Sequence, residues 1–170
     1  MIFQMKILQK LFRFFKQRRY PKNLLINGRT KLPSSAFQND DKLFRAFDKD
    51  DLDEDDNIRV ETIRFPDVSC NWSKFSIAED IKHRENGHKT DGCYSFSVSV
   101  SRYNKMATPV HDPTSDAFYP NYAHVELRVL YDGEDLLFEP PKGRELKAKS
   151  KRFEYRQNIN HFLQIECRAE

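Results

Sequence analysis

Residues 92–103, GCYSFSVSVSRY, alternate apolar and small polar side chains with great regularity. Tyr94, Phe96, Val98 and Val100 fall on one side of an extended chain, and the intervening serines fall on the other. A period of two is typical of a β-strand with one buried face, and such strands occur in antiparallel sheets. The stretch therefore predicts an antiparallel sheet with its apolar face against a core.

Other segments extend this sheet. Residues 122–131, YAHVELRVLY, alternate in the same way, and the Asp132-Gly133 turn that follows is of the hairpin type, so a return strand is expected at residues 136–138. Shorter strands are expected at residues 59–65 and 160–168. Leu43, Phe44 and Phe47 indicate a further short strand or helix.

Helical periodicity is confined to two places. Residues 76–84 fit a short helix, because Ser76 can cap its N-terminus. Residues 2–19 repeat apolar side chains at helical spacing with basic residues between them, and Pro21 ends the pattern. The fold class predicted from the sequence is therefore α+β, a mainly antiparallel sheet with an N-terminal amphipathic helix.

The basic N-terminal segment has three interpretations. It docks on its own domain or on a partner protein, it lies on a membrane surface, or it contacts nucleic acid. The contact residues in any of these cases are Lys6, Lys10, Arg13, Phe14 and Phe15. The phenylalanines weigh against nucleic acid, because phosphate binding does not need an apolar face. We favour an anchor, because the basic residues concentrate in this segment.

Charge divides the chain into three parts. Residues 1–39 carry nine Lys and Arg and no acid, whereas residues 40–56 carry nine acids and three bases, and the remainder is balanced. The expected organisation is a basic helical tail at 1–22, a loop-rich segment with an acidic run at 23–56, and a strand-rich globular domain at 57–170.

Several classes of protein are excluded by the sequence. The three cysteines form no C-x-x-C pair, no secretory signal is recognisable, and no apolar run reaches the roughly 20 residues that span a bilayer. A cytoplasmic location is expected. The acidic run lacks the glycine and the terminal glutamate of a calcium loop, and no phosphate-binding or zinc motif occurs, so no cofactor and no metal are expected.

Two groups of residues could carry chemistry. Asn71, Trp72, Ser73 and Lys74 bring an amide, an indole, a hydroxyl and an ammonium together, which would suit an anion or the edge of a base. A loop anchored by a buried tryptophan is the alternative. A more diffuse cationic set is spread over several segments: Arg64, Lys74, Arg102, Lys105 and Arg128.

The second group centres on two histidines. Tyr122, His124 and Glu126 project from one face of a strand, so His124 could exchange protons while Glu126 orients it, and His111 could be a second imidazole. Two histidines and an acid also resemble an incomplete metal set. The alternative is that this face is only the solvated side of the strand.

Three short elements of the chain resemble a loosely defined set of small, uncharacterised prokaryotic proteins. They are LPSSAF at 32–37, FPDVSCNWSKF at 65–75, and HDP at 111–113 with NYAHVE at 121–126. Similar proteins carry P-S-S-A-F, S-x-N-x-x-K and H-D-P…N-x-A-H elements in this order. The resemblance implies a shared fold around a shared site and an association with defence or mobile-element systems, and it implies no particular activity.

Two functions from different classes follow. The first is a protein-interaction or adaptor module that is anchored to a protein partner through the basic segment. The alternative is a metal-independent enzyme that acts on RNA or a nucleotide, with His111 and His124 exchanging protons and Lys74 holding the phosphate. The enzyme requires that both imidazoles and Lys74 face one pocket.

Overall fold

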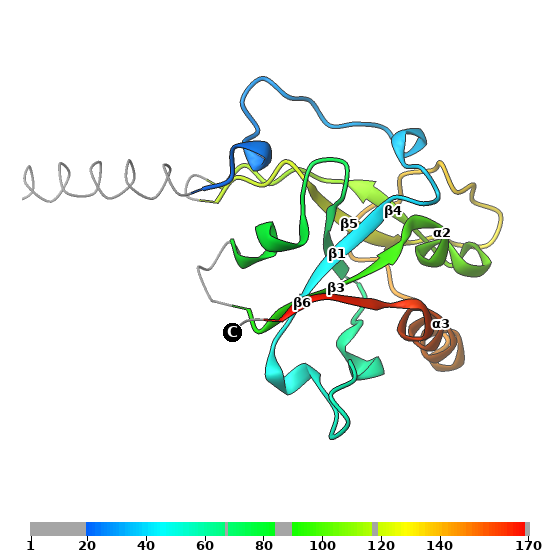
Figure 1. Cartoon of the computed structure of the whole chain (residues 1–170). Coiled ribbons are helices and arrows are strands. Elements are labelled where there is room, and N and C mark those ends of the chain that lie inside the picture. The colour runs from blue at the N-terminus through cyan, green and yellow to red at the C-terminus, as the bar shows by residue number, and fades with distance from the viewer. Residues whose placement is uncertain (1–19, 67, 84–89, 117–118, 169–170) are drawn as a thin grey trace, which may run out of the picture.

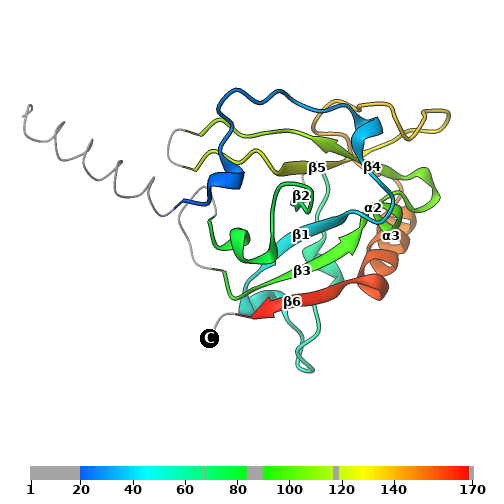
Figure 2. The same cartoon turned by 45° about the horizontal axis from the view of Figure 1, so that its top comes forward.

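Six strands form one antiparallel sheet in the computed structural model, which describes residues 20–66, 68–83, 90–116 and 119–168. The strands are β1 (Lys42–Phe47), β2 (Val68–Trp72), β3 (Gly92–Ser97), β4 (Ala107–His111), β5 (His124–Val129) and β6 (Gln164–Arg168). They lie in the order β4-β5-β2-β1-β3-β6 (Figure 1, Figure 2). Two α-helices, α2 (Val98–Ser101) and α3 (Lys149–Phe162), and short 3-10 turns connect them.

Alternation along the strands decides which face of the sheet is buried. In β5, Val125, Leu127 and Val129 are fully buried in the main apolar cluster, as the sequence predicts. His124, Glu126 and Arg128 project from the opposite face. The one Trp of the chain, Trp72, is also fully buried in that cluster at the end of β2. The core therefore lies on one side of the sheet, and the polar side chains of β5 lie on the other.

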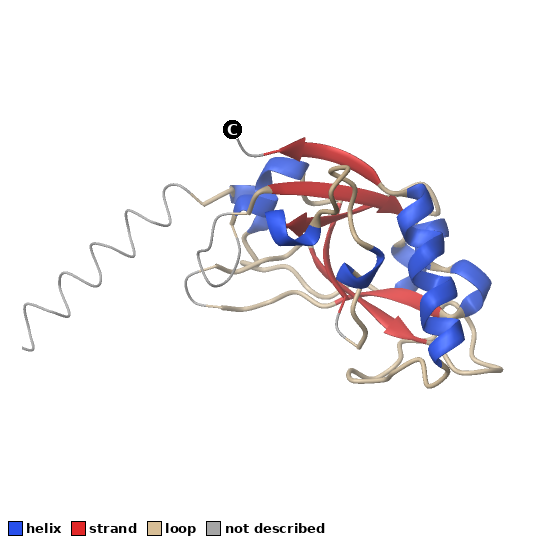
Figure 3. Ribbon diagram, turned by 90° about the horizontal axis from the view of Figure 1, so that it is seen from below, coloured by secondary structure: helices blue, strands red, loops and turns tan. Residues whose placement is uncertain are grey.

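The long helix α3 packs beside this core (Figure 3). Tyr155 and Ile159 are fully buried, and Phe162 follows at the next helical interval. The Tyr155 hydroxyl donates a hydrogen bond to the carbonyl oxygen of Ser101, 2.5 Å away. The segment contains no Gly or Pro, so nothing in its backbone chemistry interrupts the helix.

The predicted fold class needs correction. The antiparallel sheet is present, but the long helix of the described chain is α3 near the C-terminus, where the sequence suggested only a strand from residue 160. The expected N-terminal helix falls on residues 2–19, which lie outside the described residues. The sequence signal for α3 was weak because only two of its fourteen residues are buried.

The predicted strand at 93–103 is wrong in its second half. β3 ends at Ser97, and the chain turns into α2, where Val98 is still buried. The Ser97 hydroxyl accepts a hydrogen bond from the Val100 N–H at 3.3 Å, which caps this short helix. Alternating Ser and Val residues therefore continue from a strand into a helix without a change in composition.

Three smaller expectations also change. Residues 78–82 form a 3-10 helix, and the Asp80 carboxylate, rather than Ser76, accepts the Ile77 N–H at 3.0 Å. Residues 136–138 form no return strand, and the Leu136 carbonyl oxygen accepts a hydrogen bond from the Thr108 hydroxyl. The expected strand at 59–65 is a single 3-10 turn over Val60–Thr62.

The segment that was set apart as loop-rich contributes a central strand. β1 comes from residues 23–56 and pairs with β2 on one side and with β3 on the other. Within the described ranges, no helix combines the length and the apolar content needed to cross a membrane.

Candidate functional site

His111 lies in an aromatic cluster inside the protein. Its ring centroid is 5.6 Å from Trp72, 5.9 Å from Phe75 and 4.9 Å from Tyr122, and the side chain is fully buried. Nδ1 accepts the Leu32 N–H at 3.0 Å, and Nε2–H donates to the Tyr122 carbonyl oxygen at 2.6 Å. Burial lowers the pKa of this imidazole. In this arrangement neither ring nitrogen is free to exchange a proton with a substrate.

The short elements quoted above meet in this cluster. Phe37 stacks on Trp72 with ring centroids 4.0 Å apart, and Trp72 Nε1–H donates to the Asp41 carboxylate at 2.8 Å. Tyr122 is buried, and its hydroxyl donates to the Thr30 carbonyl oxygen at 2.7 Å. These contacts join the LPSSAF, NWSKF, HDP and NYAHVE segments. Trp72 and Tyr122 therefore have a structural role in the core.

Ser73 and Lys74 point elsewhere. The Ser73 hydroxyl accepts the Lys42 N–H at 2.9 Å, so it ties the end of β2 to the start of β1. Lys74 is exposed, and its ammonium lies 5.1 Å from the centroid of the Trp72 ring. Of Lys74, His111 and His124, only His124 lines one of the two cavities described below.

Asn71 and His124 do come together. They lie opposite each other on β2 and β5, and the Asn71 amide oxygen accepts from the Asn121 side chain at 2.7 Å. His124 Nδ1 is 2.7 Å from the Asp112 carbonyl oxygen, to which it donates, so in the neutral imidazole the lone pair is on Nε2. Asn71, Asn121 and His124 line the same cleft, and the sequence had marked only Asn71 and His124 of the three.

Glu126 belongs to a separate network of charges on the same face of β5. The Lys142 ammonium lies 2.6 Å from the Asp112 carboxylate and 3.0 Å from that of Glu126, and Arg128 contacts both acids. Burial opposes the ionisation of Asp112, but the hydrogen bond from Lys142 and the positive charges of Lys142 and Arg128 together outweigh it and lower the pKa of Asp112. Hydrogen bonds to the two acids raise the pKa of Lys142.

This network also bears on metal binding. One ligand atom from each of Asp112, His124 and Glu126 lies within 4.8 Å of the others, a spacing that could hold a metal ion. However, Lys142 and Arg128 already supply two positive charges to the two carboxylates. The geometry therefore fits a closed ion network better than a metal centre.

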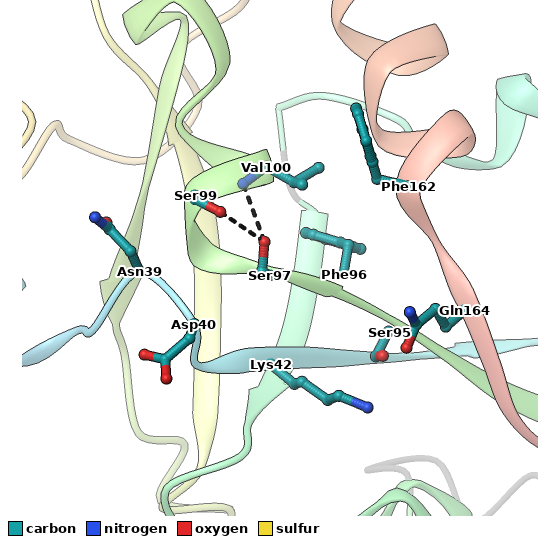
Figure 4. A pocket seen from close by; sticks show the side chains of 10 residues that line it. All are labelled: Asn39, Asp40, Lys42, Ser95, Phe96, Ser97, Ser99, Val100, Phe162 and Gln164. Carbon is teal, nitrogen blue, oxygen red and sulfur yellow. Dashed lines mark hydrogen bonds between the residues drawn. The ribbon is translucent and has the colours of Figure 1, made fainter.

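A groove beside β6 was missed by sequence reasoning. It has a volume of about 470 Å³ and opens where β3 extends beyond β6, since Ser95 pairs with Gln164, the first residue of β6. Phe162 lies across the groove from Val100 (Figure 4). The other lining residues are Asn39, Asp40, Lys42, Phe96, Ser97 and Ser99. Only the strand register brings these segments together, so the sequence carried no signal for the groove.

The two edge strands of the sheet, β4 and β6, differ in how far they are covered by the rest of the described chain. All five residues of β4 are buried, Pro109 removes one backbone donor, and the loop around Leu136 is hydrogen-bonded to Thr108. Along β6, by contrast, Gln164, Ile165 and Arg168 are exposed, and no strand of the described residues pairs with its outer edge. One edge is thus covered, and the other is unpaired within the described residues.

The candidate residues thus occupy a buried aromatic cluster, a cleft and an ion network. The contact residues Lys6, Lys10, Arg13, Phe14 and Phe15 lie outside the described residues. Comparisons of the chain with protein-family models, with curated proteins and with solved structures gave no match. The function is therefore inferred from the geometry of the described residues.

Proposed function

We propose that this protein is a protein-interaction module that binds an extended segment of a partner protein along the outer edge of β6. The single observation that carries the proposal is the open edge of β6 beside a groove, while the opposite edge at β4 is covered. An uncovered edge offers main-chain donors and acceptors to an added strand, and side-chain pockets beside it give specificity.

Exposed apolar side chains support the same surface. Phe162 is 53% exposed and Ile165 is 40% exposed, and they flank the first residue of β6. The groove adds Phe96 and Val100, together with the Ser97 hydroxyl. A partner segment with alternating apolar and polar side chains fits this lining, because the apolar ones would cover Phe162 and the polar ones would meet the serine.

A second copy of the chain is a poorer occupant of the edge. Antiparallel pairing of two β6 strands about Glu166 would set two carboxylates opposite each other, and within the described residues only the Lys42 ammonium, 2.7 Å from Glu166, would offset their repulsion. The register shift between Cys93 and Tyr94 further limits long edge-to-edge pairing. These features suit one short segment of a different protein.

The test uses the full chain and a library of extended 12-residue peptides. Peptides selected on the wild-type protein should slow hydrogen exchange at the amides of β6 and should bind at least tenfold more weakly to Phe162→Glu and Ile165→Lys. The matched control is Phe153→Glu, because Phe153 lies on the same helix with the same 53% exposure, about nine residues from Phe162. The control should bind as tightly as the wild type.

Two results would overturn the proposal. One is a set of selected peptides that protect amides elsewhere or bind all three variants equally. The other is a stable homodimer of the chain alone, measured by light scattering, that Ile165→Lys dissociates, because the edge would then be a self-association surface.

A further inference from the structure

The two central strands of the sheet separate along part of their length. β1 and β2 pair only at Leu43 with Trp72 and at Phe44 with Asn71. Beyond these pairs, β1 stays bonded to β3, whereas β2 stays bonded to β5. The guanidinium of Arg45 spans the gap and donates to the Ser69 carbonyl oxygen at 2.8 Å. The sheet is therefore split near its middle.

A cleft of about 560 Å³ opens at this split. This volume is within the range of small-molecule sites, and the cleft shares no lining residue with the groove beside β6. Phe44, Ala46 and Ile81 form an apolar part of its wall. The remaining lining residues are polar or charged, apart from Cys70: Arg45, Asp48, Asp51, Thr62, Arg64, Ser69, Asn71, Asp80, His83, Asn121 and His124.

The cations and the acids of the cleft differ in how they are partnered. Arg45 donates only to carbonyl oxygens, those of Ser69 and Thr62, and Arg64 donates only to that of Glu61. Within the described residues, neither guanidinium has a carboxylate oxygen within 4.0 Å, so their charges are not neutralised by an ion pair.

The acids, in contrast, receive hydrogen bonds from the chain itself. The Asp80 carboxylate is 5% exposed and accepts the Asn23 amide at 2.6 Å and the Ile77 N–H at 3.0 Å. The Asp51 carboxylate accepts the Asp48 N–H at 2.9 Å. The donors that remain for a ligand thus include the two guanidinium groups and the Ser69 hydroxyl.

We propose that this cleft binds a small molecule that carries a phosphate group, with Arg45 and Arg64 contacting the phosphate and the wall of Phe44 and Ile81 contacting its apolar part. Two guanidinium groups that pair with no carboxylate of the described residues supply two positive charges to a phosphate monoester, and their forked donors match its oxygens. Asn71, which lines the same cleft, would donate to the polar part of the molecule, and His124 would accept from it.

The test measures binding of nucleoside monophosphates and sugar phosphates by calorimetry and by changes in amide chemical shifts. The matching nucleosides and sugars, and inorganic phosphate alone, are separate arms. At least one phosphate ester should bind, its dephosphorylated form should bind at least tenfold more weakly, and the shifts should map to Arg45, Ser69 and Asn71. Arg64→Gln should weaken binding at least tenfold, and it should fold normally because Arg64 is exposed.

The matched control is Arg59→Gln, an exposed arginine five residues earlier that does not line the cleft, and it should bind as the wild type does. Equal weakening by both variants, binding that does not need the phosphate, or no binding of any compound would overturn the proposal. Phe162→Glu should leave ligand binding unchanged, so failure at this cleft is distinguishable from failure at the edge of β6.

Discussion

Gly92 is a position where the sheet leaves no space for a side chain. A Cβ built on this residue would lie 2.2 Å from Phe47 Cζ and 2.7 Å from the carbonyl oxygen of Cys167. Since the second contact is main chain of β6, a side-chain rotation cannot relieve it. Gly92→Ala should lower the free energy of unfolding by about 1–3 kcal/mol, measured in urea, and should speed amide exchange in β6.

The control for Gly92 is Gly28→Ala. Gly28 has φ +71 and nothing within 4 Å of the position that a methyl group would take, so its substitution strains the backbone without crowding β6. Amide exchange in β6 should therefore be unchanged in the control. Unchanged exchange in Gly92→Ala as well would show that β6 adapts to the methyl group.

His111 makes stability depend on pH. Because burial lowers its pKa in the folded state, the unfolded chain, with a pKa of about 6.5, binds a proton that the folded chain does not. Stability should be complete above about pH 6.5 and should fall as the pH drops from there towards the lowered pKa. Urea unfolding at pH 7.5 and 5.5 should show a smaller loss in His111→Asn than in the wild type.

His83 has a lowered pKa for the same reason, burial, so it contributes in the same direction. Comparing His111→Asn with His83→Gln separates the two contributions. Equal pH dependence in the wild type and in His111→Asn would contradict the prediction. A second check is the ring nitrogen spectrum of His111, which should show the Nε2–H tautomer at pH 7.5.

At the residue scale, the sequence identified polar groups but not their partners. His111 and Tyr122 looked like functional groups, yet both hydrogen-bond to backbone inside the core. Asn71 and His124 do share a cleft, but the β2–β5 register that brings them together is a tertiary property. Arg45 was not singled out, because nothing in the sequence shows that β1 and β2 separate beside it.

At the scale of elements, α3 offers a matched pair of substitutions. Ile159 is fully buried, whereas Phe153, on the same helix, is 53% exposed. Ile159→Ala should lower the free energy of unfolding by about 2–5 kcal/mol, and Phe153→Ala should change it by roughly 0.5 kcal/mol or less. Chemical denaturation measures both. Similar losses in the two variants would mean that α3 is not docked on the core as described.

The same elements show where pattern reasoning succeeds and fails. The alternation of β5 was sufficient to predict a strand and its buried face, because each of its apolar side chains contacts the core. The alternation of residues 92–103 was misleading past Ser97, since burial of Val98 is compatible with a strand or with a helical turn. β1, β2 and β4 were not recognised as full strands, because central and buried strands lose the clear contrast between their faces.

At the scale of the whole molecule, we expect the basic segment to be separable from the domain. The buried clusters of the described residues take their side chains from Tyr20 to Ile159. A chain that begins at Tyr20, after an initiating Met, should keep its Tm within about 3 °C of the full chain. A larger fall would indicate more than about 1 kcal/mol of stabilisation from residues 1–19.

The control for this truncation removes five more residues. Leu24 is fully buried and packs with Tyr20 and Ala123, and its carbonyl oxygen accepts the Tyr122 N–H at 2.9 Å. A chain that begins at Leu25 loses these contacts and should therefore melt clearly lower than the chain that begins at Tyr20. If both truncations lower the Tm equally relative to the full chain, residues 1–19 contribute to the fold, and the view of that segment as a separable anchor is wrong. If the Tyr20 chain keeps its Tm and still binds the selected peptides, the edge of β6 is sufficient for the interaction.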